Sequence, residues 1–160
     1  MSAIAGIYHR NGSPARADSL AAISRRLATM GPDGEQFAAR GPVAMVYRPF
    51  ETNRRSRPAR WPSVGADGSL IAFDGRLDNR HDVQHALAAA ATGGDDAQLM
   101  LAAYRQRGLE GLALCVGDFA LALWDPAART LVLCCDGLGR RPLFYRVTRE
   151  SVLWLSLIHI

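Results

Sequence analysis

The chain contains no lysine, and all 19 of its basic residues are arginines. Its 15 acidic residues leave a net charge of only +4, which is a small surplus for a chain of 160 residues. The densest basic stretch, residues 54–60, is interrupted by proline and has no aromatic stacking pattern. Such a stretch is typical of a solvated loop rather than of an anion or nucleic-acid patch. The sequence therefore predicts no nucleic-acid partner.

Long apolar runs are also missing. No stretch of 18 or more apolar residues occurs, and Met1 is not followed by a basic segment and an apolar core like those of signal peptides. We therefore expect no membrane association and a cytoplasmic location. Cysteine is scarce: Cys115, Cys134 and Cys135 lack metal-ligand or redox-pair spacing. Adjacent strand residues point to opposite faces, so Cys134 and Cys135 cannot easily share a metal. We interpret the three cysteines as buried thiols in a reducing compartment.

The remaining composition is that of one globular domain, because 49% of the 160 residues are hydrophobic. Apolar patterning predicts strands over residues 3–8, 36–39, 43–47, 69–73, 117–124 and 130–135. Helical patterning predicts helices beginning near Ser13-Pro14, from Asn79 to Ala90, and from Asp95 to about Arg107. The strand over 117–124 is apolar on both faces, which predicts a sheet covered on both sides. Stacked sheets enclosed by helices satisfy this pattern.

The last six residues, 155–160, abandon the alanine- and arginine-rich style of the rest. They match a conceptual translation of a transposon end used in sequencing-library preparation. We therefore expect native sequence over 1–154 and a non-native tail over 155–160, with a further domain missing beyond it. The alternative is an ordinary apolar C-terminal strand.

Four segments in order resemble one known family. They are the N-terminal stretch 2–7, Phe73–Asn79, Asp95–Leu101, and the hairpin Gly117–Asp125 followed by Cys135–Tyr145. Together they resemble the glutaminase domain of class II glutamine amidotransferases of the asparagine synthetase family, from Met1 to about Leu153. Divergent relatives such as β-lactam synthetases and lasso-peptide cyclases resemble the chain most. The resemblance implies an α+β fold: the four-layer αββα sandwich of N-terminal-nucleophile hydrolases, with two mostly antiparallel sheets between helix layers.

The resemblance also implies roles for five positions. Ser2 stands at the nucleophile, Asp74 and Gly75 at the oxyanion hole, Arg48 at the arginine that pairs with the glutamine α-carboxylate, and Asp96 at the acid that binds its α-amino group. A planar guanidinium suits a carboxylate. Four of these positions also have a structural alternative: Ser2 as a small residue at a strand start, Gly75 as a turn glycine, Arg48 as a surface arginine, and Asp96 as a helix-start carboxylate.

Two of these positions depart from the family. The family has cysteine where Ser2 stands, and a serine hydroxyl is far less acidic than a thiol, whose pKa is about 8.5. The family has asparagine where Asp74 stands, and an ionised aspartate has no donor for an oxyanion. Loss of one such donor costs roughly 10²–10³ in rate. Arg76 and the pair Thr29-Met30 depart as well.

These departures predict a degenerate glutaminase-like domain of an ATP-dependent amide-forming ligase. The alternatives are an active glutaminase that uses Ser2 and supplies ammonia for asparagine synthesis, and a non-catalytic binding module. The expected partners are glutamine or a vestigial glutamine pocket and a downstream synthetase domain, and a homodimer is left open. ATP and magnesium belong to that missing domain, because its Ser-Gly-Gly-x-Asp-Ser loop is absent. We expect no metal or other cofactor in this chain.

Overall fold

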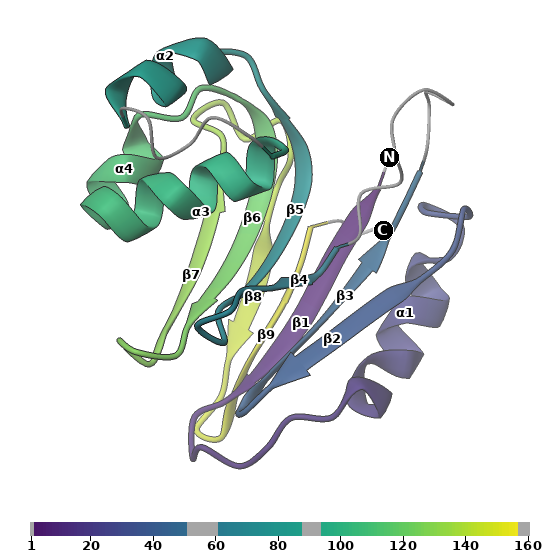
Figure 1. Cartoon of the computed structure of the whole chain (residues 1–160). Coiled ribbons are helices and arrows are strands. Elements are labelled where there is room, and N and C mark those ends of the chain that lie inside the picture. Colours follow the sequence, from purple (N-terminus) through teal and green to yellow (C-terminus); the bar gives the residue numbers. More distant parts are fainter. Residues whose placement is uncertain (1, 51–60, 88–93, 157–160) are drawn as a thin grey trace.

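Two antiparallel sheets stack face to face between layers of helices, as Figure 1 shows for the computed structural model. The structure describes residues 2–50, 61–87 and 94–156. The basic stretch 54–60, the predicted helix end at Ala90 and residues 157–160 lie outside this part. The layers follow the order helix, sheet, sheet, helix, which confirms the predicted αββα sandwich.

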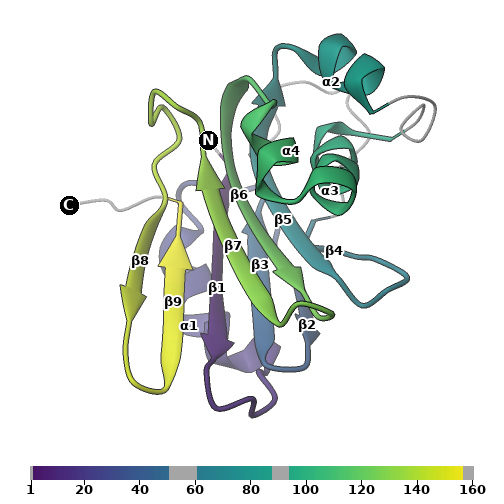
Figure 2. The ribbon, with the colours of Figure 1, turned by 90° about the vertical axis from the view of Figure 1, so that its left-hand side faces the viewer.

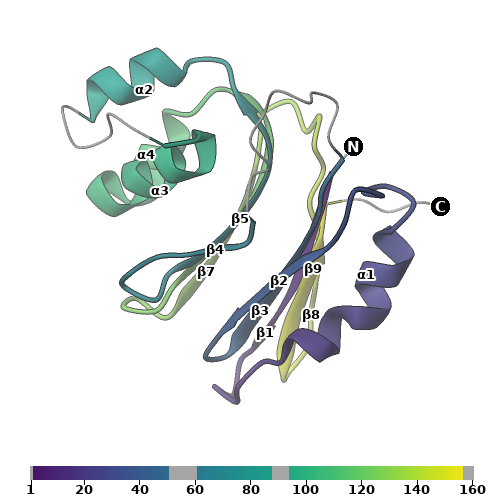
Figure 3. The ribbon, with the colours of Figure 1, turned by 45° about the vertical axis from the view of Figure 1, so that its right-hand side comes forward.

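The five-stranded sheet has the order β2-β3-β1-β9-β8 and carries the beginning of the chain. Its central strand β1 pairs with β3 on one side and β9 on the other. Alternate residues face the two sides: Ile4 joins the core between the sheets, whereas Ala5 packs with Leu20 and Leu27 beneath α1. Figure 3 shows α1 along the outer face of this sheet. The elements of this half are β1 (Ala3–His9), η1 (Ala17–Leu20), α1 (Ala21–Leu27), β2 (Gln36–Arg40), β3 (Val43–Arg48), β8 (Phe144–Val147) and β9 (Ser151–Leu155).

The four-stranded sheet has the order β4-β5-β6-β7 and is covered on its outer face by three helices (Figures 1 and 2). Six consecutive residues of its strand β6, from Phe119 to Trp124, are buried. This confirms the prediction of a strand covered on both faces. The elements are β4 (Ser63–Val64), β5 (Leu70–Leu77), α2 (Arg80–Ala86), α3 (Asp96–Arg107), α4 (Leu109–Ala113), β6 (Gly117–Asp125) and β7 (Thr130–Cys135).

Three local predictions were wrong. The first helical turn begins at Ala17 rather than near Ser13, because the Ser13 hydroxyl bonds His9 Nδ1 in the turn after β1. The Asn79 side chain does not cap α2: it donates to the Leu114 carbonyl and accepts from the Val116 N–H, 35 and 37 residues away. Cys135 is exposed rather than buried. A local contact four residues back accompanies the first difference, and contacts with a distant segment, which single-sequence patterns do not encode, account for the second.

The start of the predicted non-native tail is part of the five-stranded sheet. Leu155 is the last residue of β9, and Ser156 is buried beside it. The Ser156 hydroxyl accepts from the Ile4 N–H at 2.9 Å, and the Ser156 N–H donates to the Ile4 carbonyl at 2.8 Å. These two residues therefore extend the pairing along β1, while the origin of the tail stays a prediction. No helix in the described part of the chain has the length and apolarity that a membrane crossing requires.

Gly6 is required by the packing of Trp154 against β1. A Cβ at this glycine would lie 2.1 Å from Cζ2 of the buried Trp154 ring. We expect Gly6→Ala to lower the free energy of unfolding by about 1–3 kcal/mol through overpacking. Urea unfolding followed by circular dichroism measures the change. Adding Trp154→Phe should recover part of the loss; an additive double variant would contradict the clash.

Asp67 stabilises the turn between β4 and β5 in a pH-dependent way. Its carboxylate accepts from the Ser69 hydroxyl at 2.7 Å and from Arg105 at 2.6 Å, and these donors, Ser69 first, lower its pKa from 3.8 to about 2. A lowered folded-state pKa gives stability that is present above pH 3.8 and lost as the pH falls toward 2. Because the side chain is half exposed, we expect Asp67→Asn to cost about 1 kcal/mol or less at pH 7. The difference in unfolding free energy between the two proteins should vanish when unfolding is measured in acid. A difference that does not change with pH would contradict the role of the Asp67 carboxylate.

Candidate functional site

Ser2 lies at the start of the central strand β1, at the end of the sandwich where β5 also ends (Figures 1 and 3). It is buried, and its hydroxyl oxygen accepts hydrogen bonds from the Phe50 N–H at 3.0 Å and from the Tyr47 hydroxyl at 3.2 Å. A hydroxyl oxygen has two lone pairs, so both acceptor positions are engaged. The position predicted for the nucleophile is thus well fixed, but its oxygen is committed to the protein.

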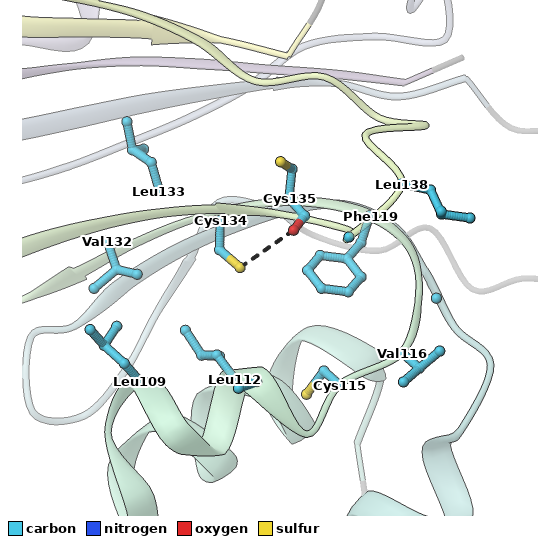
Figure 4. A pocket seen from close by; sticks show the side chains of 13 residues that line it. Leu109, Leu112, Cys115, Val116, Phe119, Val132, Leu133, Cys134, Cys135 and Leu138 are labelled. Atoms are coloured by element: carbon cyan, nitrogen blue, oxygen red, sulfur yellow. Dashed lines mark hydrogen bonds between the residues drawn. The ribbon is translucent and has the colours of Figure 1, made fainter.

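Asp74 lies on the inner face of the four-stranded sheet, the face turned toward Ser2. Strand pairing places Asp74 opposite Ala120, and Ala120 opposite Cys135, so the three share one face. In Figure 4 the Cys135 side chain points toward the five-stranded sheet, whereas Cys134 points toward α4. The Ser2 side chain contacts Tyr47, which belongs to the same inner core as Ile4. Ser2 and Asp74 therefore face the same space between the sheets.

The Asp74 carboxylate is almost fully buried, with 6% of its side chain exposed, and is paired with Arg141. Arg141 Nη1 donates to Asp74 Oδ1 at 2.7 Å, across 67 residues of sequence. Burial raises the pKa of Asp74 more than the charge and hydrogen bond of Arg141 lower it. The position expected to hold an oxyanion donor holds a compensated carboxylate instead.

Arg141 is itself held in place by Asp136. The buried Asp136 carboxylate accepts from three backbone N–H groups, those of Leu138, Arg140 and Arg141, each at 3.1 Å. Burial alone would raise the pKa of Asp136, but these donors lower it. The loop over 136–141 connects β7 of one sheet to β8 of the other, so it crosses the end of the sandwich near Ser2 (Figure 3).

Gly75 is required by its strand neighbour and its backbone angle. Its φ is +146°, and an added Cβ would lie 2.1 Å from the Asp118 carbonyl oxygen and 2.6 Å from the Phe119 Cα. The residue lies inside β5, so the alternative of an ordinary turn glycine does not account for it. Close approach of the backbone of β6 does.

Arg48 points to the opposite side of the five-stranded sheet from Ser2. It pairs with Ala3, which belongs to the core beneath α1. Its guanidinium donates from Nε to the Ser24 hydroxyl at 2.9 Å and forms an ion pair with Glu35 at 2.9 Å. A further donor, Nη1, bonds the Gly34 carbonyl at 3.1 Å. The arginine expected to bind an α-carboxylate is therefore already neutralised within the chain.

Asp96 is the first residue of α3 and is also paired. Its Oδ2 accepts from the Leu77 N–H at 2.8 Å, at the end of β5, and its Oδ1 pairs with Arg80 at 2.5 Å. Asp95, not Asp96, caps the helix by accepting from the Gln98 N–H at 3.0 Å, as the capping-box pattern predicts. Asp96 thus lies in the first turn of α3, as the helix-start alternative describes, and it also joins α3 to β5 and α2.

The structure therefore brings Ser2, Asp74 and Gly75 to one end of the sandwich but separates Arg48 from them by a sheet. Sequence reasoning missed the partners that neutralise the charged positions: Glu35, Arg80 and Arg141. Arg141 lies in a segment already matched to the family, but nothing in the sequence links it to Asp74. Within the described part of the chain, no group of three or more acidic, histidine or cysteine side chains is placed to hold a metal ion.

A separate pocket of about 720 Å³ lies on the outer side of the four-stranded sheet, between α4 and β7 (Figure 4). Its lining is mostly apolar and includes Leu112, Phe119 and Val132 together with Cys115 and Cys134. Burial raises the pKa of the Cys115 thiol to about 11, and the neighbouring Cys134 adds to this effect. These thiols are thus poor nucleophiles, and the pocket contains neither Ser2 nor Asp74.

The fold and the placement of Ser2 define the class of protein: an αββα sandwich in which a serine at the start of the central strand faces the space between the sheets. Comparison with known families identifies the particular family. Residues 1–159 match the family described as glutamine amidotransferase domain. The chain belongs to this family.

Two curated relatives are similar to parts of the chain. Asparagine synthetase [glutamine-hydrolyzing] 2 of Bacillus subtilis is 24% identical over 132 residues, which cover 80% of this chain and 17% of that protein. Amidase chry2 of Gibberella zeae is 30% identical over 74 residues, 46% of this chain and 11% of that protein. The chain thus spans less than a fifth of either relative. It is a glutamine amidotransferase domain related to asparagine synthetase.

A solved structure shows the same fold. Glutamine phosphoribosylpyrophosphate amidotransferase from B. subtilis, complexed with ADP and GMP, superposes with a TM-score of 0.69 over 96% of this chain and 41% of its own. The sequences are only 14% identical, so this likeness concerns the fold alone. It agrees with the predicted sandwich of N-terminal-nucleophile hydrolases.

Arg141 compensates a buried charge, so its loss should be costly. We expect Arg141→Gln to lower the free energy of unfolding by about 3–5 kcal/mol, because it leaves the Asp74 carboxylate buried and unpaired. A carboxyl group whose folded pKa is raised destabilises the fold as the pH rises from 3.8 through that pKa. The deficit should therefore be large at pH 7 and shrink in acid.

Urea unfolding at several pH values measures this deficit. The double variant Asp74→Asn/Arg141→Gln removes both charges and should recover most of the loss at pH 7. If the double variant were as unstable as Arg141→Gln alone, the pairing would not be the source of the cost.

Proposed function

We propose that this chain is a degenerate glutaminase-like domain of an asparagine-synthetase-like ATP-dependent ligase, and that it does not hydrolyse glutamine. The observation that carries the proposal is Asp74, an acceptor-only carboxylate that faces the same space between the sheets as Ser2. An oxyanion forming there would meet a negative side chain rather than an amide donor.

The other charged positions support the same proposal. Glutamine carries an α-carboxylate and an α-amino group, and each needs a counter-charge when it is buried. Arg48 is paired with Glu35, and Asp96 is paired with Arg80. To bind glutamine at either position, the chain would first have to break an existing ion pair. A site whose charged groups are already paired within the chain provides little charge complementarity to a zwitterionic amino acid.

The nucleophile position adds a third argument. In N-terminal-nucleophile chemistry the attacking oxygen must present a lone pair to the carbonyl carbon while a base takes its proton. The Ser2 oxygen accepts from Phe50 and Tyr47 instead. We propose that a synthetase domain, with its own ATP and magnesium, follows in the parent protein and forms an amide bond. In that protein the present domain serves as a structural platform.

Active glutamine hydrolysis is the second candidate. One observation favours it: Arg141 neutralises Asp74, which reduces the repulsion that an ionised carboxylate would impose on an oxyanion. Ser2 is also held at the inner face by defined contacts. In this case Ser2, after removal of Met1, supplies both hydroxyl and amine, and the ammonia serves asparagine synthesis. A non-catalytic binding module remains the third candidate, with no observation that favours it specifically.

Glutamate and ammonia release from glutamine decides between the first two candidates. We expect no turnover above that of the Ser2→Ala variant at pH 7–8, measured by an enzyme-coupled glutamate assay. Mass spectrometry of the same sample establishes whether Met1 has been removed, because a blocked amine would itself prevent the reaction. Turnover that Ser2→Ala abolishes would contradict the proposal and favour the working glutaminase.

A further inference from the structure

The buried carboxylate of Asp74, which faces the same space as Ser2, is paired with the guanidinium of Arg141. Asp74 has 6% of its side chain exposed and Arg141 has 26%, so their mutual attraction is little screened by solvent. Arg141 uses Nη1 for this contact. A guanidinium carries five N–H donors, so it has the capacity to bind a second acceptor without losing the first.

Arg141 does not depend on Asp74 for its position. Its backbone N–H, with those of Leu138 and Arg140, donates to the buried carboxylate of Asp136, which fixes the loop over 136–141. Leu143, just after the loop, packs against the core between the sheets. The backbone of Arg141 is therefore fixed at the end of the sandwich by its own loop, independently of Asp74. If Asp74 lost its charge, the Arg141 side chain would still start from this position.

We propose that Arg141 determines the charge specificity of the Ser2 site, and that Asp74 is an internal counter-anion that occupies it. With the pair intact, the charge of Arg141 is offset by that of Asp74, and the site favours neutral groups. With the Asp74 charge removed, the guanidinium is exposed to the site and selects small carboxylates. The assignment concerns the charge that a ligand meets, and it holds whether or not glutamine is hydrolysed.

Arg140 provides a matched control on the same loop. Its guanidinium lies 3.7 Å from Asp118, and 63% of its side chain is exposed. An exposed pair at this distance is worth little, so the neighbouring arginine should not influence the site. Substituting each of these two adjacent arginines therefore distinguishes the effect of the buried Arg141 charge from that of the general positive charge of the loop.

The test uses a cysteine placed at residue 2 as a reporter. In the full 160-residue chain carrying Ser2→Cys, peptide mass spectrometry measures the rates at which residue 2 reacts with neutral iodoacetamide and with anionic iodoacetate. The ratio of the two rates cancels differences in thiolate fraction, because both reagents attack the same thiolate. Cys115, in the pocket beneath α4, reports general opening of the fold in the same spectra.

We expect Asp74→Asn to raise the iodoacetate-to-iodoacetamide ratio at residue 2 at least about fivefold, because the substitution leaves the guanidinium without its counter-anion and so attracts the anionic reagent. The double variant Asp74→Asn/Arg141→Gln should return the ratio to its original value, and Asp74→Asn/Arg141→Lys should keep it raised. Arg140→Gln should change nothing, and the ratio at Cys115 should stay constant throughout.

Two results would overturn the proposal. One is an unchanged ratio at residue 2 in Asp74→Asn. The other is a raised ratio that persists when Arg141 is also replaced by glutamine. A merely structural role of the pair would speed both reagents together and would leave their ratio unaltered, so it is distinguished from charge specificity. Absence or presence of glutamine turnover moves neither result.

Discussion

The ion pair between Asp74 and Arg141 is the contact on which the character of the site depends. It joins β5 to the loop that crosses from one sheet to the other, on the face that is turned toward the space that Ser2 also faces. A buried carboxylate without a partner is expensive, so the fold tolerates Asp74 only because Asp136 fixes the loop that presents Arg141. The position that the sequence predicts for an oxyanion donor holds a buried charge pair.

The other charged positions, Arg48 and Asp96, are also paired with groups of the same chain. Arg48 is anchored beneath α1 by Glu35 and Ser24, on the far side of the sheet from Ser2. Asp96 ties α3 to the end of β5 and to Arg80. Each of these groups stabilises the sandwich where a substrate-binding role would require it to be available.

Much of the fold could be predicted from the sequence because its strands are strongly patterned. The β6 segment is apolar on both faces, which required a covered sheet, and the pairing of β6 with β7 followed from a short turn. The end of α2 and the true start of α1 could not be predicted. The role of Asn79 before α2 could not be predicted either, because its side chain bonds a distant segment at Leu114 and Val116 instead of capping the helix.

The site was less accessible to sequence reasoning. The order of motifs pointed to Ser2, Asp74 and Gly75, and strand alternation is consistent with Ser2 and Asp74 each facing the space between the two sheets. The direction of Arg48 depends on register, since a shift of one residue turns a side chain to the opposite face of a sheet. The partner of Asp74 depends on a loop 67 residues away. Neither follows from a single sequence.

The most direct measurement of the central claim is calorimetric titration of the chain with L-glutamine. If the charged positions are satisfied internally, no saturable binding should appear at millimolar glutamine, and the heats should match those of the Ser2→Ala variant. Stoichiometric binding of glutamine that Arg48→Gln or Asp96→Asn weakens would show that the site still opens to its substrate. That result would contradict the account.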